Sequence, residues 1–224
     1  MSVGPGRDAI EEVLAQLYGE LQPVHWTVGH PWSLGGPDPL EGVSAYPRTD
    51  PVPHWHYIGY GMSELGEKEW DDPAVSGWGF EFTFRLAGDI GAAQAPIWPA
   101  HFLQDLARYV FQSGKWFEPG HTIKANGPLA ADRPDSAIQA VGFVTDPELG
   151  AIATPNGRVA FLQIVGLTKT EYQAALGGKL LALLDGLAPR LPLFVTDIDR
   201  ESLVAAPKPQ AQWPRWGGGL RGRA

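Results

Sequence analysis

Four stretches of the chain repeat apolar residues at helical spacing, and their ends carry residues typical of helix termini. In the longest stretch Pro99 falls in the first turn, where its missing N–H is not needed, and Gly114 suits the position after the last turn. Thr168 and Glu171 have the spacing of a capping box, and Asp8 is the expected N-cap of the first helix. The predicted helices are residues 8–18, 98–113, 168–176 and 179–187.

The clearest strand pattern is the strict alternation of apolar and polar residues over residues 80–86. Three phenylalanines and a leucine share one side, whereas Glu81 and Arg85 lie on the other with a threonine between them. This pattern predicts an antiparallel sheet with one face on the core and one in water, where the two charges would contribute little. Residues 159–165 follow an Asn-Gly turn signal and are apolar on both sides, which predicts a covered central strand. The predicted strands are residues 54–60, 80–86, 138–144, 159–165 and 193–196, and residues 22–53 and 64–77 are predicted to be irregular.

Helices and strands do not alternate regularly along the chain, and no repeat is visible. This order disfavours a doubly wound parallel sheet and favours an α+β fold, with a mixed, largely antiparallel sheet packed against several helices. Periodicity ends near residue 206. We therefore expect a folded domain over residues 1–205 and a flexible C-terminal tail over residues 206–224.

Charge and composition exclude several classes of function. The net charge is −8, and the basic cluster of the chain lies in the expected tail, at Arg215, Arg221 and Arg223, so no nucleic acid partner is expected. The chain has no cysteine, which excludes disulfides and thiolate metal sites and makes a reducing cytosol the default compartment. The N-terminus lacks the apolar core of a signal peptide, and no apolar run is long enough to span a bilayer. A cytoplasmic protein without membrane contact is expected.

One pair of histidines is the remaining candidate for a catalytic metal site. His54 and His56 stand two positions apart on a predicted strand, so both imidazoles share a face and could reach one metal ion. No third ligand is specified by spacing, and the alternative is that both rings are hydrogen-bonded within the sheet. The sequence has neither a nucleophile elbow nor a phosphate-binding loop. We expect no enzymatic activity and no cofactor, with a metal-dependent hydrolase built on this pair as the alternative.

Tryptophan is unusually frequent, with nine in the chain. Its ring combines a large apolar area with a hydrogen-bond donor, and it is enriched at binding surfaces as well as in cores. Five tryptophans in or beside predicted loops are therefore either core residues or anchors for a partner: Trp26, Trp32, Trp70, Trp78 and Trp116.

Five segments, taken in order, resemble the Suppressor of fused family. The similarity spans about residues 25–204, and Thr196-Asp197 resembles the Thr-Asp near the last strand of that family. Each segment alone is short, and it is their order that makes the resemblance specific. The five segments are His54–Ile58, Gly77–Leu86, Trp98–Pro99, Leu106–Ser113 and Phe161–Gly166.

The resemblance implies an α+β domain like the N-terminal domain of the family, which binds proteins and has no established catalysis. Animal members sequester Gli-type transcription factors, and a peptide of the factor is clamped as an added strand between this domain and a second, C-terminal one. The chain ends before such a second domain, so the short prokaryotic form is expected. Short members have been proposed as immunity proteins that neutralise toxins. The expected partner is accordingly another protein or peptide.

The resemblance also implies where a partner would bind. Tyr109 and Phe117 match family positions on the peptide-facing side, and His121 matches a family histidine. Trp116 lies beside them as a loop tryptophan. Animal members have an acidic residue just before the histidine, where this sequence has Gly120 in a loop one residue shorter. For Tyr109 the alternative is a core position on an amphipathic helix.

Overall fold

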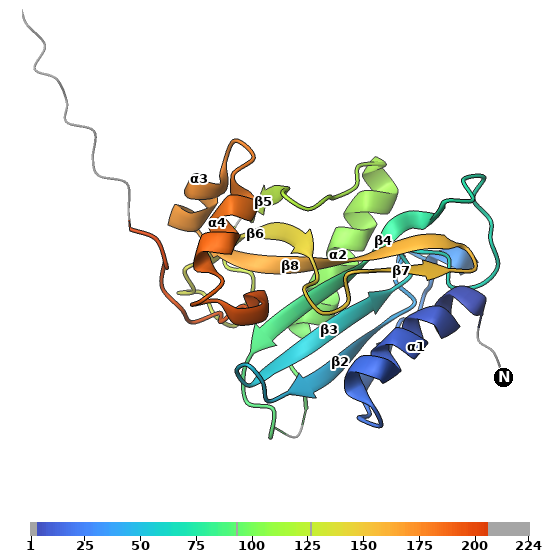
Figure 1. The fold of residues 1–224 in the computed structure, drawn as a ribbon, viewed down its shortest axis with the longest axis horizontal. Coiled ribbons are helices and arrows are strands. Elements are labelled where there is room, and N and C mark those ends of the chain that lie inside the picture. Colours follow the sequence, from blue (N-terminus) through green and yellow to red (C-terminus); the bar gives the residue numbers. More distant parts are fainter. Residues whose placement is uncertain (1–3, 93, 126, 206–224) are drawn as a thin grey trace, which may run out of the picture.

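The computed structural model describes residues 4–205 except residues 93 and 126, and the expected tail lies outside these residues. The described part forms one eight-stranded sheet with helices on both faces (Figure 1). The sheet order is β1-β2-β3-β4-β8-β6-β5, and β7 pairs with β8 beside this path. The strands are β1 (Val24–Thr27), β2 (Gly42–Arg48), β3 (His54–Tyr60), β4 (Val75–Ala87), β5 (Thr122–Lys124), β6 (Ile138–Thr145), β7 (Ala151–Thr154) and β8 (Gly157–Thr168). The helices are α1 (Pro5–Tyr18), α2 (Trp98–Ser113), α3 (Lys169–Ala175) and α4 (Leu180–Leu187), with 3-10 turns at Trp32–Leu34 and Pro192–Phe194.

The sheet is mixed but mostly antiparallel, which confirms the predicted α+β fold. Of the paired strands, β4 and β8 alone run parallel within the described residues. Parallel neighbours need a long crossover, and here residues 88–156 supply it, with α2 and three strands between the two.

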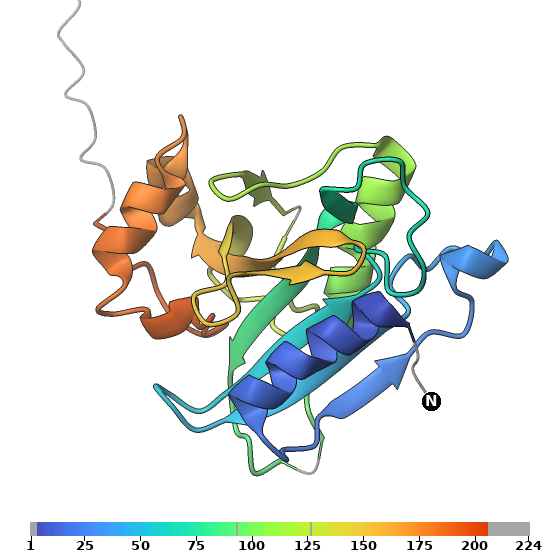
Figure 2. The ribbon, with the colours of Figure 1, turned by 45° about the vertical axis from the view of Figure 1, so that its right-hand side comes forward.

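Apolar side chains cover both faces of the sheet. On one face, α2 inserts Leu103, Ala107 and Val110 against buried rings of β4 such as Phe82. The other face is divided: α1 packs with Ile10 and its neighbours over β2 and β3, and α3 and α4 pack over β6 and β8. Figure 2 shows α1 lying along the front of the sheet while α2 stands behind it. The core is therefore built as two layers, one on each side of the sheet.

The predicted water-facing side of β4 is wrong. Glu81, Thr83 and Arg85 are all fully buried. Alternation correctly places them opposite the phenylalanines, but α1 and the turn after β6 cover that face as well. A polar residue in a strand has the same sequence pattern whether its partner is water or a buried hydrogen-bonding group, so the pattern could not distinguish the two.

Residues 22–53, predicted to be irregular, contain β1 and β2. Gly42 and Pro47 interrupt the strand signal of β2, and pairing with both neighbours overrides that weak propensity. The predicted strand at residues 193–196 is instead a 3-10 turn with one isolated parallel bridge, Leu86 to Thr196. Strands β5 and β7, of three and four residues, are too short for periodicity to reveal.

Elements with strong local signals are placed correctly. β3 and α2 have the predicted boundaries, and α2 ends at Gly114 in the left-handed conformation. The capping box of α3 is confirmed, since the Glu171 N–H donates to the Thr168 side chain and the Thr168 N–H donates to the Glu171 carboxylate. The first helix begins earlier than predicted: its N-cap is Gly4, without a side-chain cap, and not Asp8.

Candidate functional site

The sheet ends at β5, a short strand bonded to β6 on one side only. Its register pairs Ile123 with Val141, and main-chain bonds flank this pair from Ala125 N to Gln139 O (2.9 Å) and from Phe143 N to His121 O (3.0 Å). In an antiparallel strand, the main-chain N–H and C=O groups of successive residues point alternately toward the partner strand and away from it. Thr122 and Lys124 therefore direct their N–H and C=O groups away from β6, and no main-chain group of the described residues pairs with them.

A stack of rings leads from the surface beside β5 into the core. Tyr109, on α2, is 45% exposed and stacks on Phe117 with ring centroids 5.7 Å apart. Phe117 is buried and stacks in turn on Phe143 of β6, at 4.3 Å and an interplanar angle of 6°. The core interpretation of Tyr109 is thus wrong, because its ring is the outer member of the stack. Phe117 is the buried support that fixes this ring.

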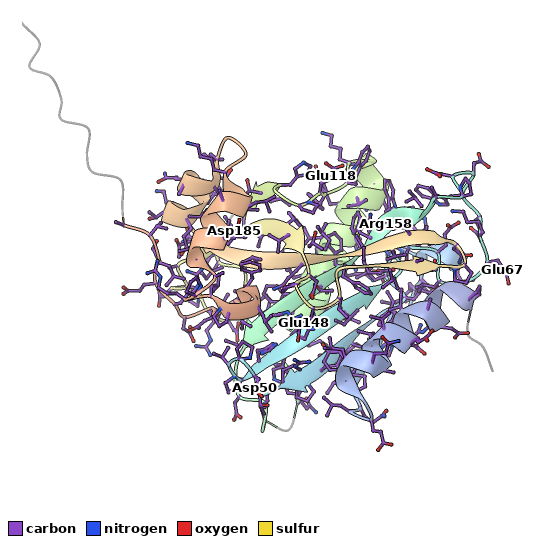
Figure 3. The ribbon with its side chains drawn as sticks, viewed as in Figure 1. Asp50, Glu67, Glu118, Glu148, Arg158 and Asp185 are labelled. Carbon is purple, nitrogen blue, oxygen red and sulfur yellow. The ribbon has the colours of Figure 1, made fainter. Side chains whose placement is uncertain are left out.

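Trp116 and His121 are joined by Glu118, a residue that sequence reasoning missed. Trp116 is 52% exposed, and its Nε1 donates to Glu118 Oε1 at 3.2 Å. The amide of Glu118 donates to His121 Nδ1 at 3.2 Å, which places the proton of the neutral ring on Nε2, 4.0 Å from the carboxylate. These residues, with Gly114 and Lys115, line an open depression of about 280 Å³. Figure 3 labels Glu118 beside the end of α2, on the rim of the molecule.

The four residues expected to bind a partner are therefore neighbours in space or in chain, around the open edge. The two exposed rings and His121 are accessible, while Phe117 is buried and stacked on Tyr109. Glu118 could have been suspected from its position between the ring and the histidine, but no pattern marks it. The arrangement offers main-chain hydrogen bonds, aromatic faces and one carboxylate, which are the groups that recognise an extended peptide.

His54 and His56, the expected metal candidates, lie in a buried polar network under α1. His54 Nδ1 donates to the Val52 carbonyl at 2.7 Å, so its Nε2 faces the Arg85 guanidinium at 3.4 Å. His56 Nδ1 accepts from the Tyr18 hydroxyl at 2.5 Å. Burial raises the pKa of Tyr18, so this hydroxyl keeps its proton and remains a donor.

The guanidinium that His54 faces is paired with two carboxylates. Arg85 Nη2 lies 3.0 Å from Asp146 Oδ1, and Arg85 Nη1 lies 2.8 Å from the Glu148 carboxylate, which Figure 3 labels on the α1 side of the sheet. His56 Nε2 lies 3.0 Å from Asp146 Oδ2, although the two atoms are not aligned for an ideal hydrogen bond. His54, His56 and Arg85 thus share one side of the sheet, as alternation predicts.

Burial sets the charges of this network. Burial, reinforced by the Arg85 charge, lowers the pKa of His56 to about 3, and burial also lowers the pKa of His54. Burial alone would raise the pKa of Asp146, but His56 and Arg85 beside it hold that pKa well below its usual range. The network therefore contains neutral imidazoles and an ion pair between Arg85 and Asp146. Arg85 already neutralises the Asp146 carboxylate. Within the described residues, no group of three or more histidines and carboxylates could hold a metal ion.

Comparison with known proteins identifies the family. The family model of the Suppressor of fused protein (SUFU) matches residues 36–201. The chain belongs to the Suppressor of fused family. The predicted resemblance is confirmed, and the matched range of this Suppressor of fused domain contains the open edge, its rings and most of the buried network.

Relatives of the domain include the Suppressor of fused homologs of Homo sapiens and Mus musculus, each 39% identical over 180 residues. That match covers 72% of this chain but 37% of each homolog, so the chain spans well under half the length of these relatives. Crystal structures of Drosophila Suppressor of Fused and of a Sufu–Fu complex both superpose with a TM-score of 0.79, at 33% and 32% identity. Each covers 88% of this chain, and the match covers 51% of the Drosophila chain and 91% of the chain from the complex.

A putative SUFU homolog from Neisseria gonorrhoeae shares the fold at a TM-score of 0.64 and 15% identity, over 90% of this chain and 98% of that one. No helix among the described residues is long and apolar enough to cross a membrane.

Proposed function

We propose that this Suppressor of fused domain binds a partner protein by accepting one of its segments as an additional strand on β5. The observation that carries the proposal is the outward main-chain face of Thr122 and Lys124, beside exposed rings. An added strand satisfies these groups with main-chain hydrogen bonds, and side-chain contacts select the sequence. Tyr109 and Trp116 would supply ring faces, and His121 with Glu118 a polar contact.

Three observations support partner binding at the β5 edge and bear on which partner binds there. The Tyr109 ring is held by the stack on Phe117, so binding needs little side-chain ordering. One matched structure is a Sufu–Fu complex, so a member of the family with the same fold assembles with another protein. Gly120 stands where the resemblance places an acidic residue in animal members, so we expect a partner sequence unlike the Gli peptide. As the finer proposal, the partner is a toxin, which this domain sequesters in the cytoplasm without catalysis.

The test uses substitutions that separate the outward from the inward face of β5. Lys124→Pro removes an N–H that points away from β6, whereas Ile123→Pro removes one that bonds to β6. With a partner found among the products of neighbouring genes, Lys124→Pro and Tyr109→Ala should each weaken binding about tenfold or more. Lys124→Ala keeps the N–H and is the matched control. Unchanged affinity in both test variants would refute strand addition at this edge.

Two further measurements address the finer proposal. Co-expression with a toxin encoded next to the gene should restore growth, and the restoration should be lost with Lys124→Pro. Light scattering separates binding of a foreign partner from pairing of two copies through β5, since a stable dimer of the isolated chain would leave no free edge.

A further inference from the structure

Four aromatic rings form a row on the side of α2 away from β5. Trp32 contacts Phe111 edge-to-face at 5.3 Å, Phe111 lies 5.6 Å from Trp78, and Trp78 contacts Trp70 at 5.3 Å, all between ring centroids. The two ends are open: Trp32 is 42% and Trp70 46% exposed, and Leu34 beside Trp32 is largely exposed. These rings come from three distant parts of the chain, so the fold assembles an aromatic row that no single segment contains. Tryptophan is one of the residue types enriched among the energetic anchors of protein interfaces.

The loop that carries Trp70 is held rigidly by a carboxylate. Glu64 accepts the amide N–H groups of Glu69 (2.5 Å), Trp70 (2.6 Å) and Gly77 (3.0 Å). Asn156 supports the same loop from the β7–β8 turn, with its amide donating to the carbonyl of Glu64 at 2.8 Å. The main chain of Trp70 is thus fixed while its ring remains in contact with water. A partner that covers this ring would lose little entropy in ordering it.

The surroundings of Trp70 are acidic. Glu67, Glu69, Asp71 and Asp72 are all exposed, and the loop between residues 64 and 74 has a single cation, Lys68. Its ammonium is taken up by Glu64, at 2.7 Å, and by the carbonyl of Val75. The cations on the elements packed against the loop are Arg158 on β8, whose main-chain N–H donates to the Ala74 carbonyl, and Arg7 on α1. Arg7 pairs with Glu11 and lies over the Tyr60 ring. An excess of negative charge therefore surrounds the exposed end of the row.

This row is a different surface from the β5 edge. Tyr109 and Phe111 are two positions apart on α2, which places them about 200° apart around the helix axis. Figure 3 labels Glu67, in the Trp70 loop, and Glu118, beside β5, at well-separated places on the molecule. A ligand of one surface therefore need not touch the other.

We propose that the ring row and its acidic loop form a second docking surface, which receives an arginine- or lysine-bearing segment of a partner protein. Guanidinium and ammonium groups are attracted to the faces of tryptophan rings and to carboxylates, and their aliphatic stems cover apolar surface. Trp70 is the anchor, Trp32 and Leu34 hold the apolar part of the segment, and Asp71 and Asp72 pair with its charges. This inference goes beyond the proposed function and stands independently of strand addition at β5.

In the experiment, peptides that bind the full chain are selected from a random library. Each selected peptide is then tested for binding to the variants named below. Peptides that lose binding to Trp70→Ala should be enriched in arginine and lysine, and measured individually they should bind that variant about tenfold or more weakly. Asp71→Asn combined with Asp72→Asn should weaken them several-fold and flatten their salt dependence. Trp32→Ala, at the other end of the row, is a second variant in a different segment, and urea unfolding of each variant checks that the fold is kept.

Matched substitutions elsewhere separate this surface from the first one. Trp116→Ala, at the β5 edge, and Asp185→Asn, an exposed carboxylate on α4, should leave these peptides unaffected. The proposal is overturned if no recovered peptide depends on Trp70, or if those that do are not basic. It is also overturned if a chain ending at residue 205 binds them far more tightly than the full chain, because the arginines of residues 206–224 would then be the natural occupant.

Discussion

Replacing Asp146 by asparagine tests whether the buried network under α1 stabilises the fold. Both oxygens of this fully buried carboxylate face hydrogen-bond donors only. Oδ1 accepts from Arg85 and from two amides of the following turn, at 2.9–3.0 Å. Oδ2 accepts from Thr83 at 2.9 Å and from Arg85 at 3.2 Å, and it faces His56 at 3.0 Å. In asparagine an amide NH₂ group replaces one of these oxygens, and its N–H donors would then face the N–H and O–H donors that the carboxylate now accepts from.

The expected loss follows from what the substitution leaves behind. Asparagine keeps the shape of the side chain, so no cavity forms, but the buried Arg85 loses its principal counter-charge. Removing one partner of a buried ion pair typically costs about 3–5 kcal/mol. Glu148 still lies 2.8 Å from the other end of the guanidinium, so we expect the lower end of that range, about 3 kcal/mol. For a domain stable by about 5–15 kcal/mol, this is a large fraction of the free energy of unfolding.

Urea unfolding at neutral pH measures the effect, as a lower midpoint with an unchanged slope. Asp199→Asn is the matched control, because Asp199 pairs with Arg133 at 3.1 Å on the surface and both side chains are more than half exposed. Its expected cost is below about 1 kcal/mol. Arg85→Met in the Asp146→Asn background should cost at least about 1 kcal/mol less than it does alone, because the two residues share their interaction.

Two results would refute this reasoning. One is a loss below about 1 kcal/mol for Asp146→Asn, which would mean that the surroundings of Arg85 replace the lost charge. The other is strict additivity of Arg85→Met and Asp146→Asn, which would mean that the ion pair contributes nothing specific.

Three further predictions concern local features. Tyr18→Phe keeps the ring but leaves His56 Nδ1 buried without its donor, and should lower the free energy of unfolding by about 1–2 kcal/mol in urea titrations; no loss would show that the bond is replaced. Burial raises the pKa of Glu81 from 4.5 to about 7, so its contribution to stability is full below about pH 4.5 and is lost as the pH rises through 7. The stability of the native chain relative to Glu81→Gln should therefore fall by up to about 3 kcal/mol between pH 4.5 and 8, and an opposite slope contradicts the burial argument. Gly61→Ala places a methyl group 2.6 Å from a backbone carbonyl oxygen at φ 131° and should cost about 1–3 kcal/mol, whereas Gly66→Ala meets nothing within 4 Å; equal midpoints for the two variants would contradict the steric explanation.

Sequence reasoning selected the candidate residues but could not give their geometry. Tyr109, Phe117, Trp116 and His121 were expected from the family resemblance and a loop tryptophan, and they lie around one open edge. Whether Tyr109 faces the core or the surface depended on Phe117 and Phe143 filling the space behind it. Nothing in the pattern of residues 118–124 marks a strand, because three residues are too few to show alternation.

The sequence by itself determined the elements whose hydrogen bonds and side-chain periods are local. The helix at residues 98–113, the strand at residues 54–60 and the capping box at Thr168 were predicted correctly, since their signals lie within a few residues of the bonds they form. Only the tertiary structure decided what covers each face and which polar groups meet. Arg85 and Asp146 are 61 positions apart, and a buried charge shows the same alternation as a solvated one. The partner that makes burial favourable is brought by the packing of distant segments, which local patterns do not specify.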